Sequence, residues 1–179
     1  MFSSKKVFKE VAVGIIALSM CVVANAQQKG DFSAGVNLLG GYGGNVTDFG
    51  PGVVLSYNIT DPIRVAGEFD FLWGINDKST SLVTLTSLWK EGSVYGHYLF
   101  PIGTGYLYPL VGAGIVEMTA KVKVLGITES ATLSKPVFSL GVGATGVINE
   151  KFNYSPEVRL KIVEDSFRYQ FMIGIAYKF

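Results

Sequence analysis

The sequence predicts an all-β fold, an eight-stranded antiparallel transmembrane β-barrel connected as an up-and-down meander. Apolar residues alternate with small or polar residues in one segment after another, and a two-residue period is that of a β-strand. Glycine, asparagine, aspartate and proline separate these segments, and no convincing helical periodicity follows residue 26. The clearest segments carry aromatic residues at both ends of an aliphatic stretch, which is typical of strands that cross a membrane.

The first 26 residues are typical of an export signal. A basic start is followed by an apolar run of 13 residues and then by the small residues Ala24 and Ala26, which form the pattern that signal peptidase recognises. The run is shorter than the ~20 residues of a spanning helix, so a retained membrane anchor is the weaker alternative. A methionine before Cys21 argues against a lipoprotein site. We therefore expect a signal peptide over 1–26 and a mature chain that begins at Gln27.

The mature domain, residues 27–179, is nearly neutral. The signal holds three lysines and one glutamate, so 12 of the 15 basic residues and 13 of the 14 acidic residues remain. This balance gives no electrostatic reason to expect nucleic acid as a partner. The single cysteine leaves with the signal, so no disulfide is expected, and one domain is the expectation at this length.

The first four strands are expected over 30–42, 50–60, 62–74 and 82–100. Turn-forming residues bound each of them. In the third segment the odd positions are mostly apolar, and the even positions hold charged or small residues together with one leucine. In the fourth segment the apolar phase slips between Trp89 and Val94, which indicates either a β-bulge or a misjudged strand boundary there.

The last four strands are expected over 106–123, 131–147, 152–163 and 167–179. The seventh segment places apolar residues at its even positions and polar or charged residues at most of its odd positions. The eighth is the most regular, because every odd position from Phe167 to Phe179 is large and apolar.

Alternation alone leaves two arrangements open. A soluble, lipocalin-like barrel buries the apolar face, whereas a membrane barrel turns that face to lipid. In the last segment Phe167 and Tyr169 lie at one end and Tyr177 and Phe179 at the other, as expected for aromatic girdles at two membrane interfaces. This favours the membrane barrel, which must close because lipid offers no hydrogen bonds to a free strand edge. Eight strands leave an interior that side chains just fill.

The polar face carries charges of both signs in similar number. We expect a salt-bridge network across the lumen, because charges away from bulk water require partners. An ion path is the alternative. The residues concerned are Arg64, Glu68, Asp70, Glu117, Lys121, Lys123, Glu157, Arg159, Lys161 and Arg168.

Two further features could indicate chemistry. The sequence GVGATG at 141–146 has the spacing of a dinucleotide-binding loop, but no helical pattern follows it, and such a site requires a helix N-terminus. His97, the one histidine, is followed by Tyr98 and Leu99 and has no adjacent serine that it could activate. No His/Cys cluster offers a metal site. We expect a non-catalytic protein with no cofactor.

The stretch YGHYLFPIGTGYLYPLVGAGIV at 95–116 and the aromatic C-terminus resemble the OmpA-like and OmpX-like small outer-membrane β-barrels of Gram-negative bacteria, also called the porin family. The resemblance covers the whole mature chain. It implies an outer-membrane location with both termini in the periplasm. The implied periplasmic turns are 58–62, 101–105 and 148–151, and the implied outward loops lie near 43–49, 75–81, 124–130 and 163–166.

The resemblance also implies partners and a role. The partners would be outer-membrane lipid, lipopolysaccharide and the outer-membrane assembly machinery, which in this family reads a final strand that ends in an aromatic residue such as Phe179. The expected protein is a monomer that contributes to envelope structure or surface interaction. A narrow porin-like channel and a soluble lipocalin-like periplasmic binding protein are the alternatives.

Overall fold

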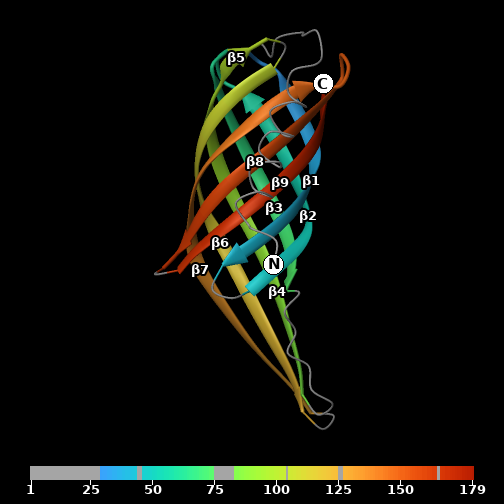
Figure 1. Ribbon diagram of the computed structural model, residues 1–179, viewed down its shortest axis with the longest axis vertical. Coiled ribbons are helices and arrows are strands. Elements are labelled where there is room, and N and C mark those ends of the chain that lie inside the picture. Colours follow the sequence, from blue (N-terminus) through green and yellow to red (C-terminus); the bar gives the residue numbers. More distant parts are fainter. Residues whose placement is uncertain (1–28, 44–45, 75–82, 104, 125–126, 165) are drawn as a thin grey trace, which may run out of the picture.

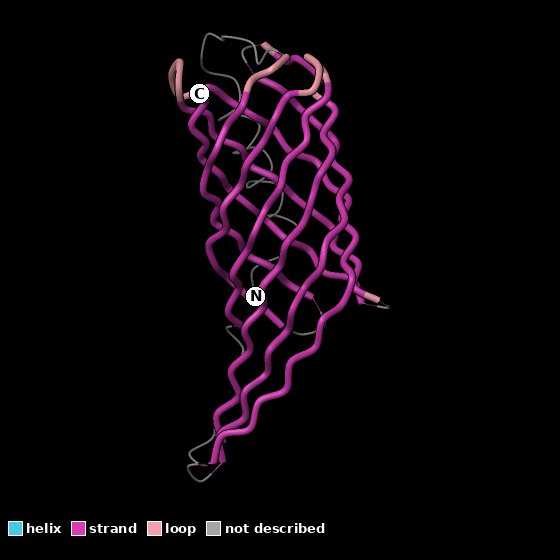
Figure 2. The backbone as a smooth tube through the Cα atoms, turned by 180° about the vertical axis from the view of Figure 1, so that it is seen from behind, coloured by secondary structure: helices cyan, strands magenta, loops and turns pink. Residues whose placement is uncertain are grey.

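The computed structural model describes residues 29–43, 46–74, 83–103, 105–124, 127–164 and 166–179. The predicted signal peptide, its cleavage position before Gln27 and the predicted loop at 75–81 lie outside the described residues. Strands account for nearly all of the described chain (Figure 2). Within that part, no helix has the length and apolar character needed to cross a bilayer.

The strands form one closed antiparallel barrel (Figure 1). Pairing of β1 with β9 and of β4 with β6 closes the ring. The short β5 continues β4, because Tyr95 pairs with Gly112 and Phe100 with Leu107 in the same register on β6. The eight-stranded up-and-down prediction is therefore confirmed. The strands are β1 (Phe32–Gly43), β2 (Val46–Asn58), β3 (Ile63–Gly74), β4 (Val83–Tyr98), β5 (Phe100–Ile102), β6 (Gly105–Val124), β7 (Ile127–Val147), β8 (Phe152–Val163) and β9 (Ser166–Lys178).

The barrel wall is apolar outside and polar inside. Outward side chains such as Val111 and Ile173 are more than half exposed, at 59% and 54%. Inward side chains such as Arg159 and Gln170 are completely buried. A lipocalin-like binder would need the reverse, an apolar interior, so that alternative is wrong. An exposed apolar surface of this extent is expected only where lipid covers it.

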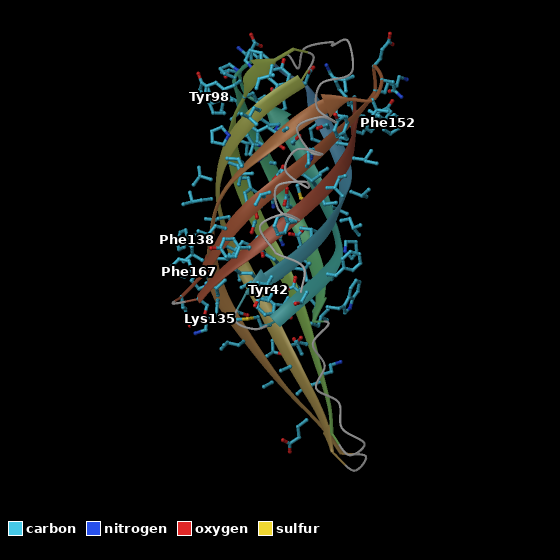
Figure 3. The ribbon with its side chains drawn as sticks, in the orientation of Figure 1. Tyr42, Tyr98, Lys135, Phe138, Phe152 and Phe167 are labelled. Atoms are coloured by element: carbon cyan, nitrogen blue, oxygen red, sulfur yellow. The ribbon has the colours of Figure 1, made fainter. Side chains whose placement is uncertain are left out.

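Aromatic side chains gather on the outward face near both ends of this wall. At the end that carries the C-terminus, the Phe179 ring lies 5.4 Å from the Phe32 ring and 5.0 Å from the Tyr177 ring. At the other end Tyr42 pairs in register with Tyr169. Figure 3 shows the same division, with Tyr98 and Phe152 toward one end and Tyr42, Phe138 and Phe167 toward the other.

Three strands continue past the rest of the barrel. β6 and β7 have 20 and 21 residues, whereas β1, β3 and β8 have 12 each. Pairing of β3 with β4 ends at Leu88, and pairing of β7 with β8 begins only at Phe138. We call the sheet of residues 83–90, 117–124 and 127–134 the extension; residues 88–90 are still paired with β3, and the rest projects past the barrel and points downward in Figure 1.

The observed strand bounds correct two of the predicted loops. The loop predicted at 124–130 is wrong, because β6 runs to Val124 and β7 begins at Ile127. The loop predicted at 43–49 is too long, because β2 already begins at Val46. The turns predicted at 58–62, 101–105, 148–151 and 163–166 all fall between consecutive strands or at their ends.

The β-bulge alternative for 82–100 is wrong as well. β4 pairs with β6 in one unbroken register from Val83 to His97. The phase slips because the polarity of the two faces inverts where β4 leaves the barrel: Trp89 lies on the inward face, whereas Val94 is an outward residue with 60% exposure. Apolar residues therefore stop facing outward near this row.

Polar contacts cover the outward face of the extension. Thr119 Oγ1 and Thr132 Oγ1 lie 3.1 Å apart, and Lys90 Nζ lies 3.2 Å from Glu117 Oε1. Outward positions on the same strands within the barrel are apolar and exposed, as at Ile115. We call the apolar outward surface of the barrel the lipid-facing belt. On β6 we place its limit between Ile115 and Glu117.

Candidate functional site

The middle of the lumen is filled by an arginine held between two glutamates. Arg159 on β8 donates to both carboxylate oxygens of Glu68 on β3, at 2.6 Å from Nη1 and 2.7 Å from Nη2. Its Nε also donates to Glu157 Oε2 at 2.8 Å. Two-point contacts between guanidinium and carboxylate are among the stronger hydrogen bonds in proteins. Because β3 and β8 lie on opposite sides of the ring of strands, these contacts cross the lumen.

Aromatic rings complete this central layer. The Arg159 guanidinium lies over the Tyr95 ring, 4.2 Å from its centroid, which is a cation–π contact. The Tyr108 hydroxyl donates to Glu157 Oε1 at 2.7 Å. Arg159, Tyr95 and Tyr108 are completely shielded from solvent, so this layer leaves little open space.

Two glycines provide room for the tyrosine rings. A Cβ atom on Gly112 would lie 2.2 Å from Tyr95 Cδ1, and one on Gly143 would lie 2.6 Å from Tyr108 Cε2. Any larger residue at either position would displace a ring. Gly143 belongs to the GVGATG sequence, which lies inside β7 and not at a strand-to-helix turn. These glycines thus have a packing role in the lumen.

A lysine and two acids form the next layer toward the extension. Lys161 Nζ donates to Glu91 Oε1 at 2.7 Å and lies 3.8 Å from Asp70 Oδ2. Ser93 Oγ donates to the same Glu91 oxygen at 2.7 Å. All four side chains are buried. Each buried charge thus has an opposite charge nearby, as removal from water requires.

The layer at the extension end of the lumen pairs Arg168 with Asp48. The Arg168 guanidinium lies 4.4 Å from the centroid of the Trp89 ring. Trp89 in turn packs against a buried apolar cluster that includes Leu72 and Met172. The lumen is therefore closed at this end by an ion pair and by apolar side chains together.

A histidine and an arginine form the layer toward the C-terminal end. Arg64 Nε donates to His97 Nδ1 at 2.9 Å, and the imidazole stacks on the Tyr108 ring with 4.9 Å between centroids. Because Nδ1 accepts this hydrogen bond, the imidazole is neutral here and carries its proton on Nε2. A cavity of about 30 Å³ lies beside this layer, which is room for roughly two water molecules.

The structure brings seven of the ten predicted lumen charges into these layers. The seven buried residues are Arg64, Glu68, Asp70, Glu157, Arg159, Lys161 and Arg168. The prediction that Glu117 and Lys121 face the lumen is wrong. Glu117 pairs with Lys90 on the outward face, and Lys121 is exposed on the extension. The side chain of Lys123 lies outside those that the structure describes.

Sequence reasoning missed two acids of the network. Asp48 falls within a predicted loop, but its strand already begins at Val46. Glu91 lies where the apolar residues of β4 change from one face of the strand to the other. The alternation of apolar and polar residues therefore did not show that its side chain points inward. Its one signal was the pattern after it, since Ser93, Tyr95 and His97 share its buried face.

Four bases and five acids are thus buried in the lumen among the described residues: Arg64, Arg159, Lys161, Arg168, Asp48, Glu68, Asp70, Glu91 and Glu157. In the same part of the chain, no group of three or more His, Cys, Asp or Glu residues is placed to hold a metal ion. The hydrogen bond that His97 accepts comes from Arg64. These contacts tie strands together across the lumen, and that is the chemistry that the site supports.

Comparisons with known proteins agree with this geometry. A family model described as outer membrane protein beta-barrel domain matches residues 12–179. Among solved structures, Ail, the attachment invasion locus protein of Yersinia pestis, is similar with a TM-score of 0.62 at 18% identity, over 85% of this chain and 100% of that one. No curated protein matches the chain.

Two further solved structures are similar. The N-terminal beta-barrel domain of Pseudomonas aeruginosa OprF has a TM-score of 0.55 at 14% identity, over 86% of this chain and 100% of that one. A major outer membrane protein from Thermus thermophilus has a TM-score of 0.62 at 11% identity, over 82% of this chain and 99% of that one. At such identities the similarity concerns the fold alone.

Proposed function

Because the chain belongs to the family of outer membrane protein β-barrel domains, we propose that it is a non-catalytic integral barrel that contributes to envelope structure or surface interaction. The barrel anchors the chain in the outer membrane. The extension is the part that it presents outside the lipid. The termini lie in the periplasm on this proposal, so the extension projects from the cell surface.

The observation that carries the proposal is the cross-lumen contact of Arg159 with Glu68. Both side chains are almost fully buried, at 0% and 2% exposure, and the contact joins opposite walls. Further buried pairs lie on the side toward the extension, including Lys161 with Glu91. A solute passing through would have to break these contacts one after another, which favours an anchor over a channel.

The extension supports the surface role. Its outward face is polar, with Thr119 hydrogen-bonded to Thr132, so this face is suited to water. On β7, residues from Glu129 to Ser134 are exposed. A sheet that protrudes from a fixed barrel with both faces accessible is suited to contact with large molecules outside the membrane.

Planar-bilayer recordings on the purified protein test the closed lumen. We expect no steady conductance from the unmodified protein, and we expect brief openings when Arg159→Ala removes the cross-lumen contact. Lys90→Ala is the matched control, because Lys90 forms an ion pair on the outward face. A large, steady conductance of the unmodified protein that changes with Glu68 substitutions would support the channel instead.

Labelling of intact cells tests the orientation. Ser130 in the extension and Glu150 in the turn between β7 and β8 are both exposed. With each replaced by cysteine, a membrane-impermeant maleimide should label Ser130→Cys in whole cells and Glu150→Cys only after the outer membrane is opened. The reverse pattern would mean that the extension points into the periplasm.

A further inference from the structure

A groove runs across the outer wall of the barrel. It measures about 410 Å³ and crosses β2, β1, β9, β8, β7 and β6. The small residues Gly40 and Ala144 and the proline Pro156 line it, together with larger outward residues such as Phe49 and Leu107. All the outward side chains that line it are apolar, so no polar ligand group would find a partner there.

The strand register explains why the wall is hollow here. Gly40 on β1 pairs with Phe171 on β9, so the outward position beside Phe171 has no side chain. Farther along, β7 and β8 pair at Gly143 and again at Gly146, but Ala144 has no pair in between. Pro156, which would face it, has no backbone N–H with which to continue the ladder. A gap in the ladder thus coincides with small outward residues.

On β9 and β1 the groove lies at mid-height on the lipid-facing wall. On β9, its lining residue Ile173 stands between Tyr169 and Tyr177. On β1, Leu38 stands between Phe32 and Tyr42. Aromatic residues at these ends mark the two membrane interfaces, so the groove is surrounded by the hydrocarbon interior of the bilayer.

We infer that this groove seats one acyl chain of an outer-membrane lipid. Acyl chains are the medium at this depth, and the groove offers them apolar walls without a polar group to desolvate. Burial of apolar surface and close packing favour a chain that lies in the groove over one that passes across a smooth wall. The site would recognise the chain and not the lipid headgroup.

A second copy of the protein fits the groove less well. Fourteen residues line the groove, and Leu39, Gly143, Glu157 and Met172 among them belong to the inward face. A stable protein–protein interface uses about 20–30 residues on each side. The groove also crosses the β1–β9 seam, so an acyl chain seated there would cover the place where the barrel closes.

A filled groove provides the test. In Gly40→Phe the new side chain occupies the groove, and there is space for it, since the nearest atom to a Cβ at Gly40 is Asp48 O at 4.0 Å. Gly96→Phe is the matched control: its Cβ also has a backbone oxygen at 4.0 Å, that of Val111, and Gly96 lies outside the groove. Ala144→Phe, with Ala113→Phe as its control, repeats the comparison if Gly40→Phe fails to fold.

The measurement is native mass spectrometry of the full protein released from nanodiscs of phosphatidylethanolamine with one palmitoyl and one oleoyl chain. We expect one retained lipid on the unmodified protein and on Gly96→Phe, and about tenfold less retention on Gly40→Phe. Phosphatidylglycerol with the same chains should be retained equally. Equal retention by all variants, retention that depends on the headgroup, or a dimer that Gly40→Phe abolishes would each overturn the inference.

Discussion

Arg159 and Glu68 meet in the middle of the lumen although 91 residues separate them in the sequence. Their two hydrogen bonds of 2.6 and 2.7 Å join strands on opposite sides of the barrel. The pair therefore braces opposite walls of the barrel, whereas the backbone pairing of the wall joins only neighbouring strands.

Removing one partner of this pair should be costly. Arg159→Leu leaves Glu68 and Glu157 buried without their base, and we expect a loss of about 3–5 kcal/mol in the free energy of unfolding. Urea unfolding in lipid vesicles, followed by tryptophan fluorescence, measures it. The double variant Arg159→Leu/Glu68→Leu should recover part of the loss, because an apolar pair replaces the ion pair.

Lys90→Ala is the control for this prediction. Lys90 and Glu117 are 42% and 41% exposed, so loss of their ion pair should cost about 0–1 kcal/mol. Equal costs for Lys90→Ala and Arg159→Leu would contradict the assignment of Arg159 to a buried brace.

The limit of the lipid-facing belt predicts a difference between two outward positions of β6. Val111→Arg places a charge near the middle of the belt and should cost about 2–4 kcal/mol, whereas Thr119→Arg beyond its limit should cost about 0–1 kcal/mol. The same unfolding assay measures both. If the two variants lose equal stability, the limit has been placed on the wrong row.

The final residue is expected to serve assembly. Phe179 N donates to Phe32 O at 3.0 Å, so the last residue helps to hold β9 against β1, and the family resemblance makes an aromatic end a recognition signal. Phe179→Ala should slow insertion more than Phe171→Ala, which removes another outward ring from the same strand. Heat-modifiable gel migration of isolated membranes measures the folded fraction, and equal fractions would remove the signal role.

The predicted export signal leads to a prediction about the mature terminus. Ala24 and Ala26 suit the peptidase, so N-terminal sequencing of protein from the cell envelope should begin at Gln27. An intact Met1 would indicate a retained anchor, and an acylated Cys21 would indicate a lipoprotein.

Much of the fold was readable because lipid and lumen impose opposite chemistry on alternate residues. In β3, β8 and β9 the apolar positions are large and the lumen positions polar, so the sequence places Glu68, Arg159 and Arg168 on the correct face. In β6, small residues occupy both faces on the way to Glu117, as at Gly112 and Ala113. Alternation then does not show which positions of β6 face the lumen, and Glu117 is predicted on the wrong face.

The extension was missed for a different reason. A strand that leaves the bilayer exchanges its faces, because water on the outward side favours polar residues such as Thr132. Between Trp89 and Val94 the apolar residues therefore move from one face of the strand to the other. In the sequence this shift looks the same as the extra residue of a β-bulge. Length was the remaining clue, since 82–100 and 106–123 exceed the ~9–11 residues that cross a membrane.

The projecting part of β7 has a consequence for life in a crowded membrane. From Ile127 to Val137 this strand has no β8 partner, so its backbone presents an open edge on which another chain could add a strand and begin an aggregate. The edge carries its own protection. Pro136 removes one donor from the ladder, and Lys135, held by Glu164, sets a charge in the path of an incoming strand. We expect these two residues to disfavour strand pairing between the β7 edges of neighbouring copies.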